Sequence, residues 1–206
     1  MQGFTTVTGT AAPLLLDDIN TDQIAPGVYL RHFRPDYAAL LFGLRRYKPD
    51  GSDDPGFVLN QPQYRQARIL VTGANFGCGS SREQAVWAMT AFGIGCIVAR
   101  GFADIYRENC LKNGLLPVVL GEAMPAFEAL VTRIDGSAPF TVSLEERHIL
   151  APDGTRFDFA ISDGERHALL HGLDDIGLTL ELADTIAAWE AQISATAPWQ
   201  QNIPGK

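Results

Sequence analysis

The feature that most constrains this fold is an alternation of short apolar runs and longer mixed segments from residue 67 to residue 120. Three apolar runs predict buried strands, namely Arg68–Thr72, Gly95–Ala99 and Leu115–Leu120. The segments between them, Ser81–Phe92 and Ala103–Asn113, predict helices. Strands that alternate with helices at this spacing form a parallel sheet with crossover helices, so we expect an α/β fold.

Further short strands are expected on both sides of this stretch. Residues 1–34 contain apolar segments broken by Asp, Asn, Pro and Gly, which predict strands and an ordered loop around residues 17–22. After Pro139, three short runs predict a hairpin or meander: Phe140–Leu144, His148–Leu150 and Arg156–Ile161. The sheet is therefore predicted to be mixed and only partly parallel, with helices on its faces.

Two helices are expected to complete a single domain of residues 1–206. They are Asp163–His171 and Asp184–Ser194, with Asp184 as the N-cap of the second helix. Residues 48–56 are rich in proline, glycine and charge, and predict a mobile surface loop. Residues 197–206 predict a loose tail.

The composition is that of an ordinary globular protein, because hydrophobic residues make up 46% of the chain and charged residues 19%. The formal net charge of −8 disfavours nucleic acid as a partner, since phosphate contacts need a basic face. This charge also opposes long-range attraction of an anionic substrate. Arginines close to the site would therefore have to bind such a substrate.

The sequence also indicates the cellular compartment in which the protein is found. No apolar stretch approaches the roughly 20 residues that span a bilayer, and the first residues lack the pattern of a signal peptide. The three cysteines, Cys78, Cys96 and Cys110, include no C-x-x-C pair. We therefore expect a cytoplasmic protein with no disulfide framework and no membrane partner.

Two motifs point to functions that the rest of the sequence does not support. Thr72–Gly79 fits the T-G-x-x-x-G-x-G phosphate loop of short-chain dehydrogenases, but the later Y-x-x-x-K pair of those enzymes is missing. Dinucleotide binding is therefore a minor alternative. The spacing of Asp18, Asn20 and Asp22 fits an EF-hand loop, but the glycine and the final glutamate of that loop are missing, which excludes calcium.

The cysteines and histidines are weaker candidates for chemistry. Cys78, beside glycines, could be a low-pKa nucleophile, and the three cysteines together could in principle ligate a cluster. However, Cys96 in a predicted strand and Cys110 in a predicted helix are typical of inert buried cysteines. His167 and His171 lie one helical turn apart without a nearby third ligand. We expect no metal bound by this chain alone.

The segment Asn75–Glu83 allows two interpretations. Ser80-x-x-Glu83 is a capping box, which by itself would only start a helix. Alternatively, the flanking glycines leave Ser80 and Ser81 unshielded at a helix N-terminus, where Arg82 adds positive charge, so the segment would bind an anion. The same positive charge would favour the deprotonated form of Ser80.

Four blocks of residues carry a resemblance to a known family. They read N-T-D-Q-I at 20–24, N-F-G-C-G-S-S-R-E at 75–83, F-A-D-I through K-N-G-L-L-P at 102–117, and G-L-D with I-G-L-T at 172–179. In this order they resemble the small subunits of 3-isopropylmalate dehydratase and, more distantly, the swivelling domain of aconitase. The resemblance covers nearly the whole chain and implies a β/β/α swivelling domain.

The resemblance also implies roles for particular residues. Ser80 would be the base that removes a proton next to a carboxylate, Ser81 and Arg82 would bind substrate, and Asp22 and Arg34 would match an acidic catalytic residue and a carboxylate-binding arginine. The substrate would be a small dicarboxylate. The [4Fe–4S] cluster of the family would lie on a separate large subunit, so this chain would bind no cofactor and would be active only in a heteromer.

Departures from the family pattern leave the substrate open. Family members commonly read S-S-R-E-H-A-P, whereas this chain has Gln84 and Val86 in place of the histidine and the proline. Isopropylmalate, and hence a role in leucine biosynthesis, is the leading expectation. The alternatives are a methylmalate, citraconate or dimethylmalate hydratase, and a non-catalytic assembly subunit.

Overall fold

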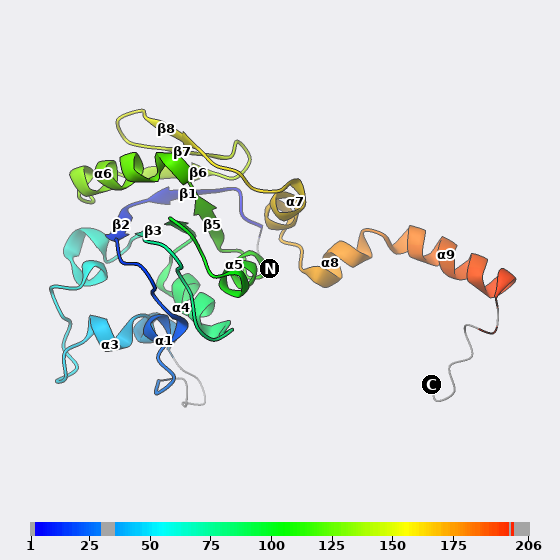
Figure 1. Ribbon diagram of the computed structural model, residues 1–206, viewed down its shortest axis with the longest axis horizontal. Coiled ribbons are helices and arrows are strands. Elements are labelled where there is room, and N and C mark those ends of the chain that lie inside the picture. The colour runs from blue at the N-terminus through cyan, green and yellow to red at the C-terminus, as the bar shows by residue number, and fades with distance from the viewer. Residues whose placement is uncertain (1–2, 30–35, 198, 200–206) are drawn as a thin grey trace. The chain divides into compact units, whose positions relative to one another are not determined.

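We describe the protein from a computed structural model, in which residues 3–29, 36–197 and 199 are placed well enough to describe. The chain forms two compact units, Met1–Gly172 and Leu173–Lys206. The first unit contains both sheets and seven of the α-helices that the described residues form, and the second contains two further helices (Figure 1).

A parallel sheet forms the centre of the first unit. Its strands are β2 (Ala11–Leu14), β3 (Ile69–Thr72), β4 (Cys96–Ala99) and β5 (Leu116–Val119), and they lie in that order. The three strands predicted between residues 67 and 120 are thereby confirmed, each shortened by one or two residues. Because all four strands run parallel, their carboxyl ends meet at one edge of the sheet.

Helices α4 (Gln84–Phe92) and α5 (Asp104–Lys112) cover one face of the parallel sheet (Figure 1). Successive strand side chains point to opposite faces, so Leu70 and Ile97 pack in the core beneath these helices, whereas Val71 and Val98 pack on the other side. Both faces are buried, which accounts for the uninterrupted apolar runs in the sequence.

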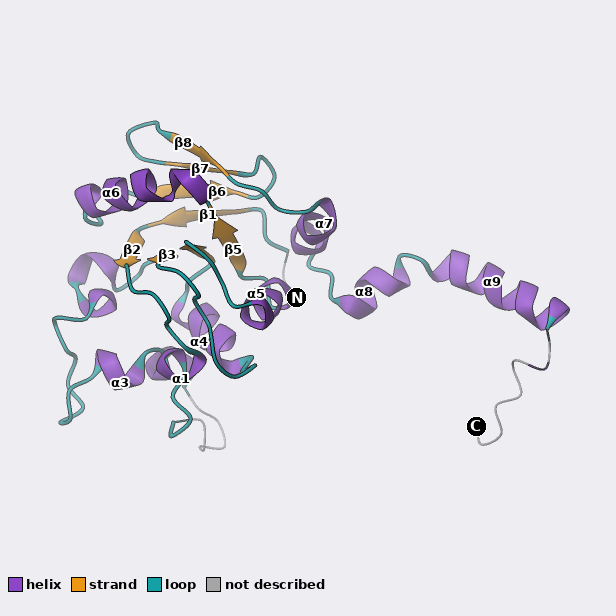
Figure 2. Cartoon of the chain, viewed as in Figure 1, coloured by secondary structure: helices purple, strands orange, loops and turns teal. Residues whose placement is uncertain are grey.

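An antiparallel sheet and α6 (Met124–Ile134) cover the other face. The strands of this sheet, in spatial order, are β1 (Thr6–Gly9), β6 (Phe140–Ser143), β7 (His148–Leu150) and β8 (Arg156–Asp158). Figure 2 shows the resulting layers of strands and helices. The α/β class and the β/β/α layering are confirmed, with two separate sheets in place of one mixed sheet.

The connection from β2 to β3 is long and built from short helices. They are α1 (Thr21–Ile24), α2 (Tyr37–Leu40), α3 (Gly43–Arg46) and the 3-10 turns η1 (Val58–Asn60) and η2 (Pro62–Tyr64), while a third 3-10 turn, η3 (Gly121–Ala123), precedes α6. Residues 48–56 are mostly exposed, and the Ser52 carbonyl accepts from the Lys48 amide at 2.8 Å. The mobility expected of this loop stays a prediction.

Two predicted helix starts were wrong. Helix α4 begins at Gln84 instead of Ser81, and the Ser80–Glu83 capping box does not form, because the Glu83 carboxylate accepts from the Asn113 amide at 2.8 Å. Likewise Leu182 is the N-cap of α9 (Ala183–Thr196), and Asp184 lies within its first turn. An acidic residue is favourable there through the helix dipole without acting as a cap.

Helix α7 (Asp163–His171) has the predicted bounds and a true capping box, formed by Ser162 and Glu165. Two guanidinium nitrogens of Arg107, on α5, donate to the Glu165 carboxylate at 2.6 and 3.2 Å. These hydrogen bonds are the main reason that the pKa of Glu165 is lowered to about 2. The ion pair therefore links α7 to α5.

We expect Glu165→Gln to lower the free energy of unfolding at pH 7 by about 1–2 kcal/mol, which is less than the full shift would convert to because the pair is partly exposed. Glutamine keeps the capping box and removes only the charge. Since the folded-state pKa is depressed, the stabilisation is present above the unfolded pKa of about 4.5 and is lost as the pH falls toward 2.

Denaturant unfolding from pH 2 to 7 measures this difference, with the exposed Glu108→Gln on α5 as the matched control. A gap between wild type and Glu165→Gln that stayed constant down to pH 2 would contradict the ion-pair account.

The second unit contains α8 (Asp175–Leu180) and α9. The side chain of Asp174 caps α8 by accepting from the Gly177 amide at 2.7 Å. The sequence predicted α9 but not α8. The predicted loose tail lies outside the described residues except for Ala197 and Trp199. Among the described helices of both units, none is long and apolar enough to cross a membrane.

Candidate active site

The loops that leave the carboxyl ends of β2, β3 and β4 are joined by main-chain hydrogen bonds. The bonds run from Asp18 N to the Ala74 carbonyl at 3.0 Å, from Thr21 N to the Cys78 carbonyl at 2.9 Å, and from Phe76 N to the Gly101 carbonyl at 3.0 Å. Ligands of open α/β sheets commonly bind outside the carboxyl ends of the strands. This edge is therefore the first place to look for a site.

The turn between β3 and α4 depends on residues with positive φ. Asn75 has a φ of 54° and its side-chain amide donates to the Asp18 carboxylate at 2.8 Å. Gly77 has a φ of 78°, and a Cβ atom there would lie 2.1 Å from Cγ of Tyr106 on α5. The turn is thus fixed against both α5 and the loop after β2.

Ser80 is exposed at the end of this turn and is held by a buried threonine. The Thr21 hydroxyl donates to the Ser80 carbonyl at 3.0 Å, and the two hydroxyl oxygens lie 3.1 Å apart. Only 1% of Thr21 is accessible to solvent. The Ser80 hydroxyl therefore has Thr21 as a partner and is exposed to a substrate.

Arg82 reaches back to the same short helix. Its Nη1 donates to the Asp22 carboxylate in an ion pair, with 34% of the Arg82 side chain and 60% of the Asp22 side chain exposed. The guanidinium also lies beside Gly27, where an added Cβ would meet Nη1 at 3.6 Å. A guanidinium has five N–H donors, so Arg82 can hold Asp22 and bind a carboxylate as well.

The structure thus brings together Ser80, Arg82 and Asp22, although Asp22 is about 60 positions away in the sequence. Ser81 is exposed between Ser80 and Arg82. Arg34, the fifth predicted site residue, lies outside the described residues. The roles given to all five residues stay predictions.

Sequence reasoning missed Thr21 as a functional candidate. The signal was available, because Thr21 stands beside Asp22 in the N-T-D-Q-I block. Only the fold shows that its hydroxyl meets Ser80, since the capping box of Asn20 and Gln23 at the start of α1 turns Thr21 inward.

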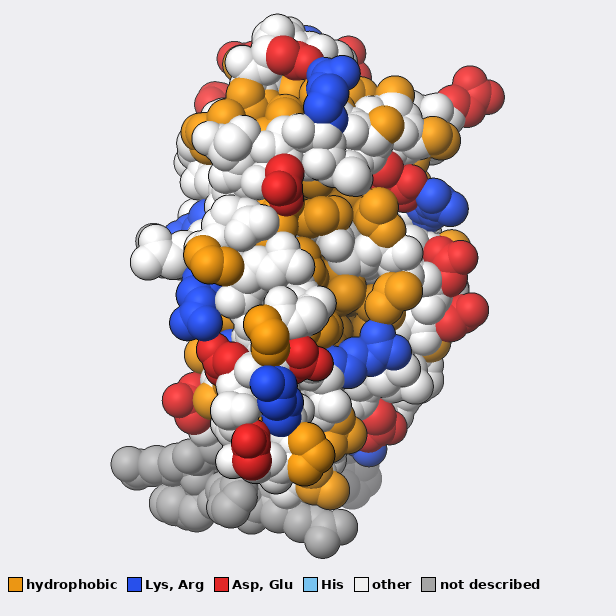
Figure 3. All heavy atoms as spheres, turned by 90° about the vertical axis from the view of Figure 1, so that its left-hand side faces the viewer, with side chains coloured by type: hydrophobic (Ala, Val, Ile, Leu, Met, Phe, Trp, Pro, Cys, Tyr) orange, Lys and Arg blue, Asp and Glu red, His pale blue; other side chains and the backbone are white. Residues whose placement is uncertain are grey.

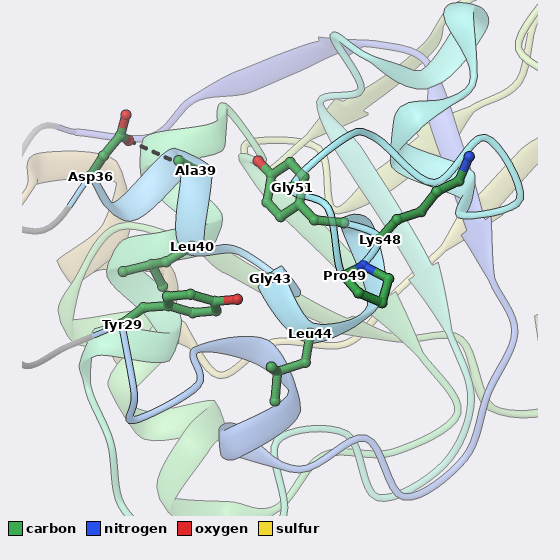
Figure 4. A pocket seen from close by; sticks show the side chains of 10 residues that line it. Tyr29, Asp36, Ala39, Leu40, Gly43, Leu44, Lys48, Pro49 and Gly51 are labelled. Atoms are coloured by element: carbon green, nitrogen blue, oxygen red, sulfur yellow. Dashed lines mark hydrogen bonds between the residues drawn. The ribbon is translucent and has the colours of Figure 1, made fainter.

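A groove of about 760 Å³ lies along α2, α3 and the segment that follows α3 (Figure 4). Its lining is largely apolar and includes Tyr29, Leu40, Leu44 and Pro49, together with Asp36 and Lys48. Tyr29 packs against Gly43 and follows Gly27, the neighbour of Arg82, by two residues.

An anionic ligand would have to be recognised by charges within the site, because the surface does not attract it from a distance. On the face shown in Figure 3, Lys and Arg side chains are interspersed with Asp and Glu around an apolar hollow. A mixed surface of this kind produces no single-sign field that could steer an anion. Binding of a carboxylate would therefore rest on guanidinium contacts such as those Arg82 can make.

The cysteines do not form a metal site. Cys96 and Cys110 are fully buried, and burial raises the pKa of both thiols. The rings of His167 and His171 lie with their centroids 4.4 Å apart and their planes tilted by 41°. Across the described residues, no three His, Cys, Asp or Glu side chains come together in a way that could hold a metal ion.

Family models match most of the chain. A model described as the aconitase C-terminal domain matches residues 1–123, and a second, described as the C-terminal domain of the 3-isopropylmalate dehydratase small subunit, matches residues 175–203. A crystal structure of 3-isopropylmalate dehydratase from Methanocaldococcus jannaschii is similar with a TM-score of 0.60 and 26% identity, over 90% of this chain and 99% of that one. The fold and the loops at its carboxyl edge thus define an aconitase-type C-terminal domain.

Full-length relatives narrow the class further. The 3-isopropylmalate dehydratase small subunit of Paracoccus denitrificans is 47% identical, and that of Dinoroseobacter shibae 48% identical, each over 97% of this chain and 100% of the relative. The chain belongs to the family of 3-isopropylmalate dehydratase small subunits.

Proposed function

We propose that this chain is the small subunit of a two-chain hydro-lyase that interconverts 2- and 3-isopropylmalate in leucine biosynthesis. The observation that carries the proposal is the identity of 47% with a small subunit of that name over nearly the whole chain. The single domain predicted for residues 1–206 is kept in the proposal, in which both compact units act as one aconitase-type swivelling domain. Its three free cysteines support a reducing cytoplasm as its location.

Arginine contacts would hold the substrate. Isopropylmalate carries two carboxylates, and charge-assisted hydrogen bonds to Arg82 and Arg34 would contribute about 1.5–3 kcal/mol each. The apolar groove beside Tyr29 supports an alkyl side group on the substrate. Ser81, exposed next to Ser80, would donate to the same carboxylate as Arg82.

Ser80 would move the proton. As an alkoxide, its Oγ takes the proton from the carbon next to a carboxylate, and the C–H electron pair forms the carbon–carbon double bond as hydroxide leaves the neighbouring carbon. Thr21 has a single O–H, which can turn from the Ser80 carbonyl to the Ser80 Oγ when that oxygen is negative. Rehydration with the two positions exchanged gives the isomer.

The hydroxide leaves only if an electrophile accepts it. The cysteines of this chain do not suit the iron–sulfur cluster that would be that electrophile. Of the three thiols that a cluster would need, those of Cys96 and Cys110 are buried and carry raised pKa values. A [4Fe–4S] cluster on a large partner subunit would supply the Lewis acid. The small subunit is therefore proposed to be inactive alone.

The substrate assignment has a same-class rival, a methylmalate, citraconate or dimethylmalate hydratase, since Gln84 and Val86 depart from the family pattern. The test is to mix this chain anaerobically with the large subunit of its host and to follow ultraviolet absorbance of the unsaturated product. Isopropylmalate, citramalate and dimethylmalate are supplied in turn. Turnover of isopropylmalate only with both chains supports the proposal, and preference for another malate replaces the substrate.

Thr21→Val should lower kcat by about tenfold or more with little change in KM. The variant lacks the hydroxyl that stabilises the Ser80 alkoxide, and a hydrogen bond to a charged group is worth about 1.5–3 kcal/mol. Without that donor the Ser80 hydroxyl loses its proton less readily. The rising limb of the pH–rate profile should therefore move to higher pH.

Thr21→Ser should restore both kcat and the pH profile. Thr8→Val is the matched control, because Thr8 shares a hydroxyl–hydroxyl contact of 3.1 Å with Thr141 on the antiparallel sheet. A Thr21→Val enzyme that is less stable but has an unshifted pH profile would reduce Thr21 to a packing residue.

A further inference from the structure

Helices α8 and α9 expose an unusual amount of apolar surface. Neither helix contains a buried residue. Within the unit Leu173–Lys206, the large apolar side chains of the two helices are left uncovered: Ile176, Leu180, Leu182, Ile186 and Trp189. Large apolar side chains left uncovered together in this way mark an interaction site.

The spacing of these residues is that of a helix that docks in a groove. Leu182, Ile186, Trp189 and Ile193 follow one another at intervals of four, three and four residues, which places them on one face of α9. The opposite face carries Asp184 and alanines, including Ala191. Anchors at this spacing are how an amphipathic helix is recognised by a partner protein.

Charge indicates the kind of partner. Residues 173–203 contain five acidic side chains and no Lys, Arg or His; the acidic residues are Asp174, Asp175, Glu181, Asp184 and Glu190. Two copies of such a segment would repel each other, whereas a groove with a basic rim would attract it. The charge thus disfavours self-association and favours a different chain.

We propose that α8 and α9 form a docking segment that binds an apolar, basic-rimmed groove on the large subunit. The inference rests on the proposed function, which requires a large subunit. The docking segment, residues 175–196, lies within residues 175–203, which match the family model for the C-terminal domain of 3-isopropylmalate dehydratase small subunits. Docking would bury Ile186 and Trp189 against the large subunit.

The test compares Trp189→Asp with Ala191→Asp, which adds the same charge to the opposite face of α9. The dissociation constant for the purified large subunit is measured by biolayer interferometry at 50 and 500 mM salt, and turnover is measured while the amount of this chain is varied. We expect Trp189→Asp to weaken binding at least tenfold, Ala191→Asp to weaken it less than threefold, and salt to weaken the wild-type complex. Turnover of Trp189→Asp should recover when this chain is supplied in large excess.

Three results would overturn the docking proposal. The first is equal affinity of the two variants for the large subunit. The second is that wild-type chains form dimers in analytical ultracentrifugation and Trp189→Asp chains do not. The third is a melting temperature that is lowered in the isolated Trp189→Asp chain but not in the isolated Ala191→Asp chain. That result would mean that α9 packs on its own chain and not on the large subunit. Failure of the proposed function is distinguishable, because wild-type subunits would then bind each other but turn over none of the three malates.

Discussion

Replacing Ser80 with alanine is expected to lower turnover of isopropylmalate by the assembled enzyme about 100-fold or more. The variant lacks the oxygen that would take the proton, while the exposed position of Ser80 leaves room for the change without loss of packing. Affinity for the large subunit and KM should change little, because Arg82 and its ion pair with Asp22 stay in place. Steady-state kinetics on reconstituted subunits measures both constants.

The control for Ser80→Ala is Ser137→Ala, which removes a hydroxyl that donates to the Ile134 carbonyl at 2.6 Å beyond the end of α6. That variant should retain turnover. If Ser80→Ala also retained it, proton transfer by Ser80 would be refuted, and the non-catalytic assembly subunit would become the better description of this chain.

The sequence predicted the parallel sheet well because its strands are buried on both faces. Runs such as Gly95–Ala99 carry no polar interruption, and glycines or prolines mark their ends. Helix α6 was not predicted, although its sequence pattern indicates a helix. Phe127, Leu130, Val131 and Ile134 recur at helical spacing after Pro125, which suits a first helical turn, and all four pack toward the core.

The start of α4 could not be read from local sequence because contacts from distant segments override it. The Glu83 carboxylate receives the amide of Asn113, which ends α5, and Ser80 is engaged by Thr21 from the loop after β2. A capping box competes only with neighbours in sequence, whereas these partners lie 30 and 59 positions away. The same distance explains why Thr21 was missed.

That Arg82 and Asp22 belong to the same site was expected only through resemblance to a family, and their ion pair was not predicted. Nothing in the charge pattern links the two residues, and the chain offers many other carboxylates to an arginine. The fold supplies the link, because the carboxyl ends of β2 and β3 are neighbours in the parallel sheet. Site residues contributed by separate loops become visible only when strand order is known.

Gly77→Ala is expected to destabilise the folded chain by about 3 kcal/mol or more, and to lower turnover through the fraction that stays folded. An added Cβ would lie 2.1 Å from Cγ and 2.5 Å from Cβ of Tyr106, which is fully enclosed in the core. Overpacking costs about 1–3 kcal/mol, and a left-handed backbone adds about 1–2 kcal/mol for alanine. Chemical denaturation of the two purified chains measures the difference.

Gly154→Ala separates the two causes, because Gly154 has a φ of 87° but no atom within 4 Å of an added Cβ. Gly154→Ala should lower the free energy of unfolding only by the cost of the left-handed backbone, about 1–2 kcal/mol. Equal losses in the two variants would mean that Tyr106 yields without penalty and that Gly77 is required for its φ alone. A larger loss for Gly77→Ala, relieved by Tyr106→Leu in the same chain, would establish that contact with α5 fixes the turn that presents Ser80.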